Sequence, residues 1–280
     1  MQAVTRVPVR DDLRALDGYH SPQVNVGVRL NTNESPFPPP PAWRDAFAAE
    51  LSRVEWQRYP DRAATQLREG IAAIHGVRPA QVFAANGSNE VLQTLLLTFA
   101  GPGRTVATFE PTYQLHGHIA RLTGAHVAEG ERAPDFTLDL AEVVRVLRES
   151  SPTVTFLCSP NNPTGLVESE ANVRAVLAEV PGLLVVDEME SRVQLIVSER
   201  ERLSAAMARM PIDVFPSGAN FILFRPRLHG GRRVWQGLLE RDVLVRDCSG
   251  WPRLENCLRV TVGAPEENDV FLNALAEVTA

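Results

Sequence analysis

The chain has 280 residues, 44% of them hydrophobic, and a formal net charge of -6 at pH 7. This length can form one large domain with a smaller companion, and the acidic balance offers no basic face for nucleic acid. No apolar run has the character of a signal peptide or the length of a membrane span. The sparse cysteines, Cys158, Cys248 and Cys257, lack metal-ligand spacing and are typical of a reducing compartment. We therefore expect a cytoplasmic protein without a metal, nucleic-acid or membrane partner.

The N-terminal stretch is predicted to be an arm. Residues 11–29 have the character of a loosely packed segment, and LNTNESPFPPPP follows, with four consecutive prolines that are incompatible with helix and strand. Helical spacing over 43–54 and 63–75 is interrupted by the turn QRYPD, which contains Tyr59. Tyr59 is either a turn aromatic packed on its own helix or a residue that reaches a neighbouring molecule.

A candidate anion site follows this region. We predict a strand over 81–85 that runs into Gly87, Ser88 and Asn89 at the start of an apolar helix. Free N–H groups at a helix N-terminus, a small hydroxyl group and a glycine that permits close approach suit a phosphate. Ser88 also fits an ordinary N-cap with Glu90 in the first turn, and the two roles are compatible.

Residues 101–150 are predicted to form a turn, a strand, a loop, a helix, a short edge strand over 126–132 and an amphipathic helix over 138–150. Tyr113 lies just past the first of these strands, where an aromatic ring can stack on a flat ligand. His116 and His118 form an H-x-H pair. No carboxylate or cysteine stands at a suitable spacing nearby, so the sequence does not favour a metal site here.

The stretch from 153 to 188 has the pattern of a βαβ unit. The apolar run TVTFLCSP ends in the turn NNPTG, and a second apolar run, LLVV, ends on two carboxylates. Ligands bind at the carboxyl ends of the strands in an open α/β sheet, so Asn162 and Asp187 should lie side by side in one crevice. Taken singly, NPTG is ordinary turn chemistry and the acidic pair is an ordinary helix cap.

The C-terminal third is predicted to contain a helix over 191–210, a strand in FPSGANFILFRP, and a helix and strand that end at Arg246. The run LRVTVG and a final helix close the chain. Arg259 in LRVTVG is either a half-exposed strand residue or a bidentate carboxylate ligand, a task that Lys performs poorly.

In this order and spacing, NPTG, the strand before Asp187, LNTNESP, RYPD and LRVTVG resemble the class II aminotransferases of the histidinol-phosphate type. These enzymes use pyridoxal 5'-phosphate (PLP) and have the aspartate aminotransferase fold. The resemblance covers nearly the full length from residue 30 onward. It implies an α/β protein with a truncated three-layer α/β/α large domain, whose sheet is mostly parallel, and a small α+β domain. The expected boundaries are 1–40 for the arm, 41–190 for the large domain and 191–280 for the small domain, in a homodimer with a shared active site.

The resemblance also implies residue roles. Asn162 holds the phenolic oxygen of PLP, Asp187 pairs with the pyridine nitrogen, and Tyr113 stacks on the ring. A fixed negative charge keeps that nitrogen protonated, which PLP requires to act as an electron sink. The implied phosphate ligands are Gly87, Ser88, Asn89 and, from the neighbouring subunit, Tyr59. The implied substrate ligands are Asn33, Asn220 and Arg259.

The sequence departs from the family after Asp187. The family continues with D-E-A-Y, two further strands, a Lys that forms the Schiff base with PLP, and an Arg on its phosphate. This chain reads DEMESRVQLIV, places Glu190 at the tyrosine position and enters the next helix directly. All 28 basic residues are Arg. A GC-rich genome explains an Arg-only surface, but it does not explain a missing catalytic amine, and no catalytic residue is assigned.

Three kinds of function follow. The first is a PLP-dependent aminotransferase that moves an amino group between an amino-acid phosphate and 2-oxoglutarate in histidine biosynthesis, with threonine-phosphate decarboxylases as relatives. The second is a non-catalytic descendant that binds PLP or a phosphorylated amine. The third is a defective reading of a normal gene that binds nothing. Transamination needs a Lys both to hold the cofactor and to move a proton, so we expect impaired activity and weak, non-covalent PLP binding.

The absence of the family's block after Asp187 also changes the sheet that we expect. In the family, two strands separate the strand before Gly87 from the strand that ends at Asp187. Unpaired apolar strands are costly, so we predict that residues 81–85 pair directly with 183–186 in a shorter, all-parallel sheet.

Overall fold

The computed structural model describes residues 8–14, 16, 22–187 and 194–280. Glu190, assigned above to the family's tyrosine position, lies outside these ranges. By its internal contacts the chain divides into a larger unit, Met1–Pro36 with Phe99–Ala280, and a smaller unit, Phe37–Thr98. The domain boundaries at residues 40 and 190 stay predictions.

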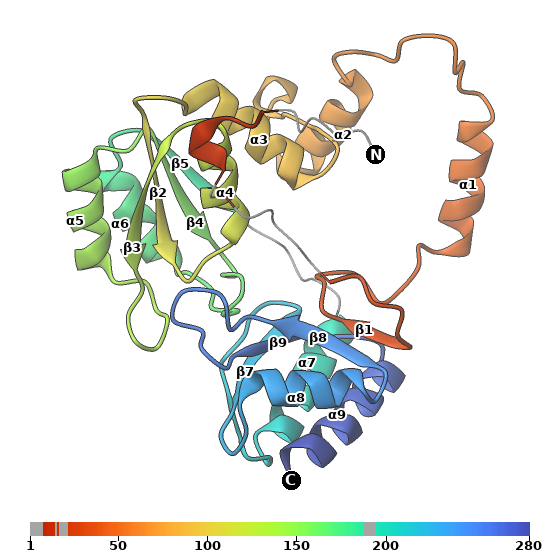
Figure 1. Cartoon of the computed structure of the whole chain (residues 1–280). Coiled ribbons are helices and arrows are strands. Elements are labelled where there is room, and N and C mark those ends of the chain that lie inside the picture. The colour runs from red at the N-terminus through yellow and green to blue at the C-terminus, as the bar shows by residue number, and fades with distance from the viewer. Residues whose placement is uncertain (1–7, 15, 17–21, 188–193) are drawn as a thin grey trace, which may run out of the picture. The chain divides into compact units, whose positions relative to one another are not determined.

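The first sheet of the larger unit has four strands, all parallel, in the order β3-β2-β4-β5 (Figure 1). Its strands are β2 (Thr105–Glu110), β3 (His126–Glu131), β4 (Val154–Cys158) and β5 (Leu183–Asp187). Every residue of β4 is buried, as expected for a parallel strand covered on both faces. The predicted edge position of β3 and the predicted βαβ unit from β4 to β5 are both confirmed.

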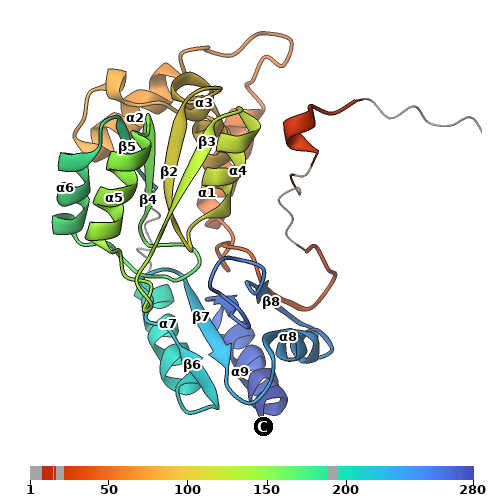
Figure 2. The same cartoon turned by 60° about the vertical axis from the view of Figure 1, so that its left-hand side comes forward.

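Helices cover both faces of this sheet. They are α4 (Gln114–Leu122), α5 (Leu140–Ser150) and α6 (Glu170–Glu179). In Figures 1 and 2, α5 and α6 lie on one face and α4 on the other. Asp139 caps α5 by accepting from the Ala141 amide at 2.9 Å, and the apolar face of α5 packs on Phe109 and Leu157. This packing fixes the strand ends at which the site lies.

The prediction of a strand over 81–85 is wrong. Residues Pro79–Gln81 form a short 3-10 helix, and residues 82–85 have no strand conformation. The guanidinium of Arg68 donates to the carbonyls of Val82 at 3.0 Å and Pro79 at 2.7 Å, so it binds backbone groups that a sheet would need. The predicted strand pairing with 183–186 is therefore wrong as well, and within the described ranges β5 is the last strand of this sheet.

The second sheet of the larger unit is mixed, in the order β1-β8-β9-β7-β6. Its strands are β1 (Val28–Leu30), β6 (Ile212–Val214), β7 (Phe221–Pro226), β8 (Val243–Asp247) and β9 (Leu258–Thr261). The end of the predicted loose arm thus contains a strand, because residues 28–30 pair in parallel with β8 and bury Leu30. A short 3-10 helix, Asp11–Leu13, precedes it.

Three helices pack on this second sheet (Figure 2): α7 (Gln194–Met207), α8 (Gly231–Leu239) and α9 (Pro265–Thr279). The core between them contains Leu203, Val234, Phe224 and Phe271. Arg253 donates to the carbonyls of Arg132 and Ala133, so the loop after β8 contacts the segment after β3. None of the helices in the described ranges combines the length and apolar character that a membrane span requires.

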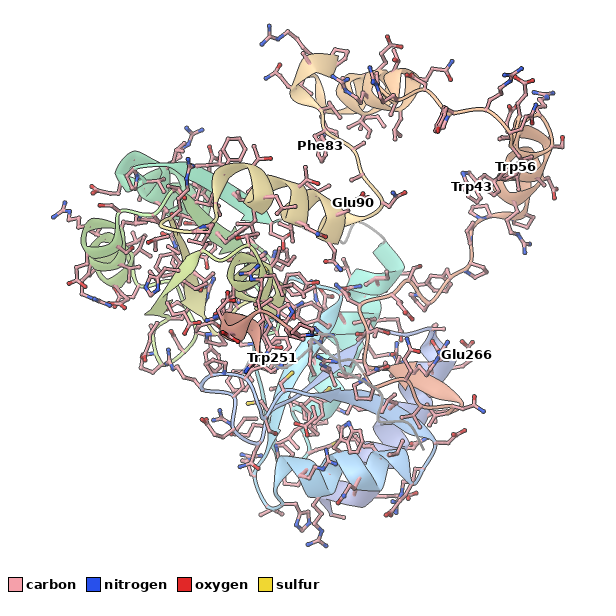
Figure 3. All side chains as sticks on the ribbon, turned by 45° about the horizontal axis from the view of Figure 1, so that its top comes forward. Trp43, Trp56, Phe83, Glu90, Trp251 and Glu266 are labelled. Carbon is pink, nitrogen blue, oxygen red and sulfur yellow. The ribbon has the colours of Figure 1, made fainter. Side chains whose placement is uncertain are left out.

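The smaller unit contains α1 (Pro41–Leu51), α2 (Thr65–His75) and α3 (Ser88–Phe99), whose last residue belongs to the larger unit. No residue of α1 is buried. Trp43 stacks on Phe47 with ring centroids 5.2 Å apart, and Figure 3 shows Trp43 and Trp56 projecting from this part of the chain. The smaller unit therefore exposes an unusual amount of aromatic surface.

Candidate functional site

The turn after β4 is locked by its own side chains. Asn161 is fully buried and donates to the carbonyl of Pro111 at 3.0 Å and to the hydroxyl of Thr164 at 2.8 Å. Gly165 has a φ of +81°, a conformation that favours glycine, and a Cβ there would collide with Ser217. These contacts fix the backbone at Asn162.

Asp187 ends β5 and lies opposite Cys158 in the sheet register. Its Oδ2 atom is 2.9 Å from Nε2 of His116, a fully buried side chain. The His116 ring stacks on Phe156 at 4.3 Å and meets Tyr113 edge to face at 5.3 Å. The ring therefore holds the carboxylate in place and supports the aromatic residue beside it.

The three predicted ring-binding residues lie at the carboxyl ends of neighbouring strands: Tyr113 follows β2, Asn162 follows β4, and Asp187 ends β5. The buried Cys158 lies opposite Asp187 in the sheet register. Burial, and to a smaller extent the negative charge of Asp187, raise the pKa of Cys158 to about 12, so the thiol is not a nucleophile at neutral pH. Asn162 and Asp187 thus lie at the same end of the sheet, where the carboxyl ends of its strands meet, as the βαβ pattern predicts.

The side chain of Arg259, on β9 of the second sheet, reaches the carboxyl ends of the parallel strands. Its Nη1 donates to Oδ1 of Asn162 at 2.7 Å and its Nη2 to the carbonyl of Asn31 at 3.1 Å. The guanidinium lies 4.8 Å from the ring centroid of Phe221. Arg259 is buried rather than half-exposed, and one of its contacts is a side chain of the NPTG turn.

Arg246 is a site residue that the sequence did not single out. It lies on β8 directly opposite Arg259, and both side chains are buried. The two buried guanidinium groups therefore place two positive charges on neighbouring strands.

The two predicted substrate asparagines differ in their surroundings. Asn220 is buried just before β7, and its Oδ1 has no hydrogen-bond partner in the described part of the chain. The loop before it contacts the NPTG turn, where Gly218 donates to the carbonyl of Gly165 at 2.8 Å. Asn33 is exposed, two residues after the Asn31 carbonyl that accepts from Arg259.

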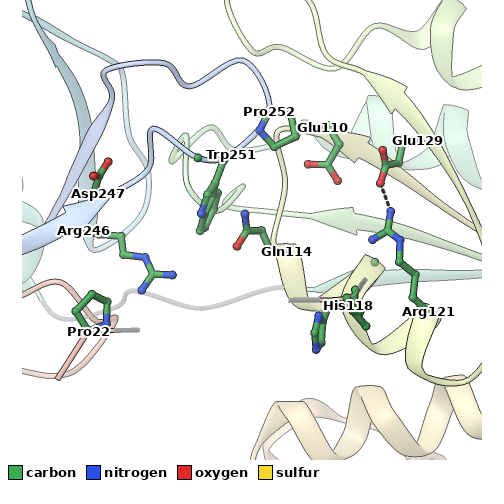
Figure 4. A pocket seen from close by; sticks show the side chains of 13 residues that line it. Pro22, Glu110, Gln114, His118, Arg121, Glu129, Arg246, Asp247, Trp251 and Pro252 are labelled. Atoms are coloured by element: carbon green, nitrogen blue, oxygen red, sulfur yellow. Dashed lines mark hydrogen bonds and ion pairs between the residues drawn. The ribbon is translucent and has the colours of Figure 1, made fainter. Parts of the chain in front are cut away.

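A cavity of about 600 Å³ opens beside Arg246 (Figure 4). Its walls combine residues of α4 and β3 with the loop after β8, where Trp251 lies 5.9 Å from the Arg246 guanidinium. Glu110 also lines it, and burial raises the pKa of this carboxyl group. His118 lines this cavity, whereas His116 contacts Asp187, so the H-x-H pair does not act as one unit. In the described ranges no three His, Cys, Asp or Glu side chains gather to hold a metal ion.

The predicted phosphate ligands belong to the smaller unit. Gly87, with a φ of +86°, precedes α3, and the exposed side chains of Ser88 and Asn89 lie in its first turn. Glu90 accepts from the Asn86 amide at 2.6 Å, which ties the loop to the helix. Tyr59 is 100% exposed. Their roles toward a phosphate stay predictions.

Comparison with known proteins identifies the family. The family model "Aminotransferase class I and II" matches residues 25–189 and 182–275. The chain belongs to the class I and II aminotransferases. Within this family it is 35% identical to histidinol-phosphate aminotransferase from Frankia casuarinae, over 96% of the chain and 89% of that relative. It is 36% identical to histidinol-phosphate aminotransferase from Streptomyces avermitilis, over 97% of the chain and 96% of that relative.

Solved aminotransferases have the same fold. The histidinol-phosphate aminotransferase from Sinorhizobium meliloti in complex with PLP has a TM-score of 0.79 at 17% identity, with 91% of each chain covered. The one from Clostridium acetobutylicum has a TM-score of 0.80 at 16% identity, covering 90% of this chain and 99% of that one. The predicted PLP-transferase fold is confirmed.

The same comparisons locate the departure from the aminotransferase pattern. The alignment with the Frankia relative has 362 positions, so at least 82 of them, the excess over the 280 residues of this chain, fall opposite gaps. The two family matches overlap at residues 182–189, at the end of β5. The break in the family pattern lies where the sequence departs after Asp187.

Proposed function

We propose that this aminotransferase-family chain binds PLP and an anionic amino-acid ligand reversibly, and that it transaminates poorly. The observation that carries the proposal is the position of Tyr113, Asn162 and Asp187 at the carboxyl ends of three neighbouring strands, in a chain whose 28 basic residues are all Arg. When bound, PLP supplies an electron sink for reactions at the carbon that carries an amino group.

The residues present fit the ring of PLP. The bond to His116 orients Asp187, whose charge would keep the pyridine nitrogen protonated. Asn162 turns Oδ1 toward Arg259, so its Nδ2 is the amide group suited to donate to the phenolic oxygen. Tyr113, braced by the His116 ring, would stack on the flat face of the cofactor.

The residues present do not fit the aldehyde end. Covalent attachment requires an amine, and the same amine must afterwards carry a proton. A guanidinium stays protonated in proteins and does not replace it. Groups suited to hold and orient the cofactor are therefore present, whereas a side-chain amine that could attach it and then carry the proton is missing from the 280 residues.

The ligand is proposed to be an amino acid or an amino-acid phosphate of the histidinol-phosphate type. Arg259 and Arg246 supply two permanent positive charges on neighbouring strands, and a guanidinium matches both carboxylate and phosphate groups. The relatives named above are histidinol-phosphate aminotransferases, in agreement with this class of ligand. Asn220 offers a buried acceptor to a ligand N–H or O–H group.

A homodimer is part of the proposal. The side chain of Tyr59 is fully exposed, as expected of a residue that acts on a neighbouring subunit. Light scattering at micromolar concentration should give at least twice the chain mass, and a monomer would contradict this point.

The test of the proposed function compares the wild-type chain with Asp187→Ala. PLP absorbance and fluorescence titrations should show saturable binding that dialysis reverses and that the variant loses. Reduction with borohydride should leave the intact mass unchanged, apart from any reaction at the terminal amine. Robust transamination by protein of verified mass would overturn the proposal, and so would equal PLP binding by the variant.

A further inference from the structure

The two edges of the parallel sheet differ in how they are protected. The β3 edge carries Glu129 and Glu131 on the strand itself, and Arg121 of α4 forms an ion pair with Glu129. Charged side chains on an edge strand discourage pairing with other strands. At the other edge β5 reads LLVVD, with its only charge at the last residue.

The backbone of β5 has hydrogen-bonding groups that turn outward. Leu183 donates to the Thr153 carbonyl and Asp187 accepts from the Ser159 amide, each at 2.9 Å, so these residues face β4. Because the direction alternates along a strand, the N–H and C=O groups of Leu184 and Val186 face away from β4. In the described ranges the sheet order has no strand beyond β5.

The side chains of this edge are apolar and accessible. Leu183 is 37% exposed and Val186 is 38% exposed. The break in the family pattern falls at 182–189, so the edge is exposed where longer relatives continue with additional chain. An apolar edge without proline, lysine or a bulge is a template for another strand.

We propose that this edge pairs with β5 of a second copy of the chain. The outward groups lie at Leu184 and Val186, symmetrically about Val185. An antiparallel arrangement places Leu184 opposite Val186 of the second copy, and Val186 opposite its Leu184. Both pairs are hydrogen-bonded, with about four hydrogen bonds in all, and a two-fold axis passes beside Val185.

The charges on the strand are compatible with this arrangement. Each Asp187 lies opposite Leu183 of the second copy, so the two carboxylates stand four residues apart along the strands. At about 3.4 Å per residue this is roughly 14 Å, beyond the Debye length of about 8 Å at physiological ionic strength. The pairing also stops at two copies, because the charged β3 strands remain at the outer edges of the joined sheet and discourage further pairing.

The register gives a direct test by disulfide cross-linking. Val185 of the two copies forms the central non-hydrogen-bonded pair, with Cα atoms about 4.5 Å apart, within disulfide range. Val185→Cys should form a covalent dimer under mild oxidation. Leu183→Cys should not, because its Cα atoms lie more than about 7 Å apart in this register. The native cysteines are all buried and give a low background.

A backbone variant provides the second measurement. Val186→Pro removes one outward N–H group, whereas Val186→Ala keeps it, so only the proline should lower the dimer fraction in sedimentation at micromolar concentration. A monomeric wild-type chain would overturn the proposal. So would a dimer that survives Val186→Pro without any Val185→Cys cross-link, since that dimer uses another surface.

Discussion

The role of Arg259 can be measured with two stable conjugates, one of phosphopyridoxal with alanine and one with ethylamine, both joined by a reduced C–N bond. They differ only in the carboxylate that Arg259 is proposed to bind. Arg259 already donates to Asn162 and to the Asn31 carbonyl, so a ligand carboxylate would replace hydrogen bonds that the free protein already makes. We therefore expect a net gain of about one charge-assisted hydrogen bond, or about 1.5–3 kcal/mol.

That gain corresponds to about 10- to 150-fold tighter binding of the alanine conjugate by the wild-type chain. In Arg259→Gln the ratio of the two affinities should fall close to one, while Gln can still donate to Asn162. Arg259→Lys should keep an intermediate ratio, because it keeps the charge and loses the bidentate geometry.

Isothermal titration calorimetry with both conjugates is the assay. Arg174→Gln on exposed α6 changes the net charge equally and should leave the ratio unchanged. Thermal melts establish that each variant is folded. An unchanged ratio in folded Arg259→Gln would refute the assignment of Arg259 as the carboxylate ligand.

Two further predictions concern stability and pH. Arg132 forms an ion pair with Glu168 at 2.6 Å, and both side chains are almost fully buried. Arg132→Met would leave the Glu168 carboxylate buried without this partner, so it should lower the free energy of unfolding by about 3–5 kcal/mol in urea titrations. Adding Glu168→Gln should restore part of that loss. No recovery in the double variant would contradict this reasoning. Burial raises the pKa of Glu110, so its stabilising contribution is present below the unfolded value of about 4.3 and is lost as the pH rises through the folded value. The stability gained by Glu110→Gln should therefore grow as the pH rises from the unfolded value through the raised folded value, and a gain independent of pH would argue against this cause.

Local patterns predicted much of the site. Asn162 and Asp187 follow two apolar runs at βαβ spacing, and parallel strands bring their carboxyl ends to one edge of the sheet. Arg259 was assigned through the resemblance of LRVTVG to the family, and the structure adds that this strand is buried. These inferences depend on the order of elements along the chain, which the sequence contains.

Contacts between distant segments were harder to predict. His116 carries no local sign of its contact with Asp187, 71 residues later, and the H-x-H spacing directs attention to metals instead. The strand at 28–30 depends on β8, more than 200 residues away. The apolar residues after Gln81 have strand composition, but Arg68 binds the carbonyl of Val82 and the segment forms no strand. In each case a long-range partner decides the structure and local composition does not.

The residues proposed to hold the PLP ring lie in parts of the chain that do not depend on the amine that would react with the cofactor. The NPTG turn is closed by Asn161, Asp187 is held by His116, and Arg259 comes from the second sheet. None of these supports uses a contact with the block that the family places after residue 187. The absence of that block therefore removes the amine and leaves the proposed ring-binding groups in place. Under the proposed function, the occupancy of a site without covalent attachment depends on the free PLP concentration, and binding without turnover is the expected outcome.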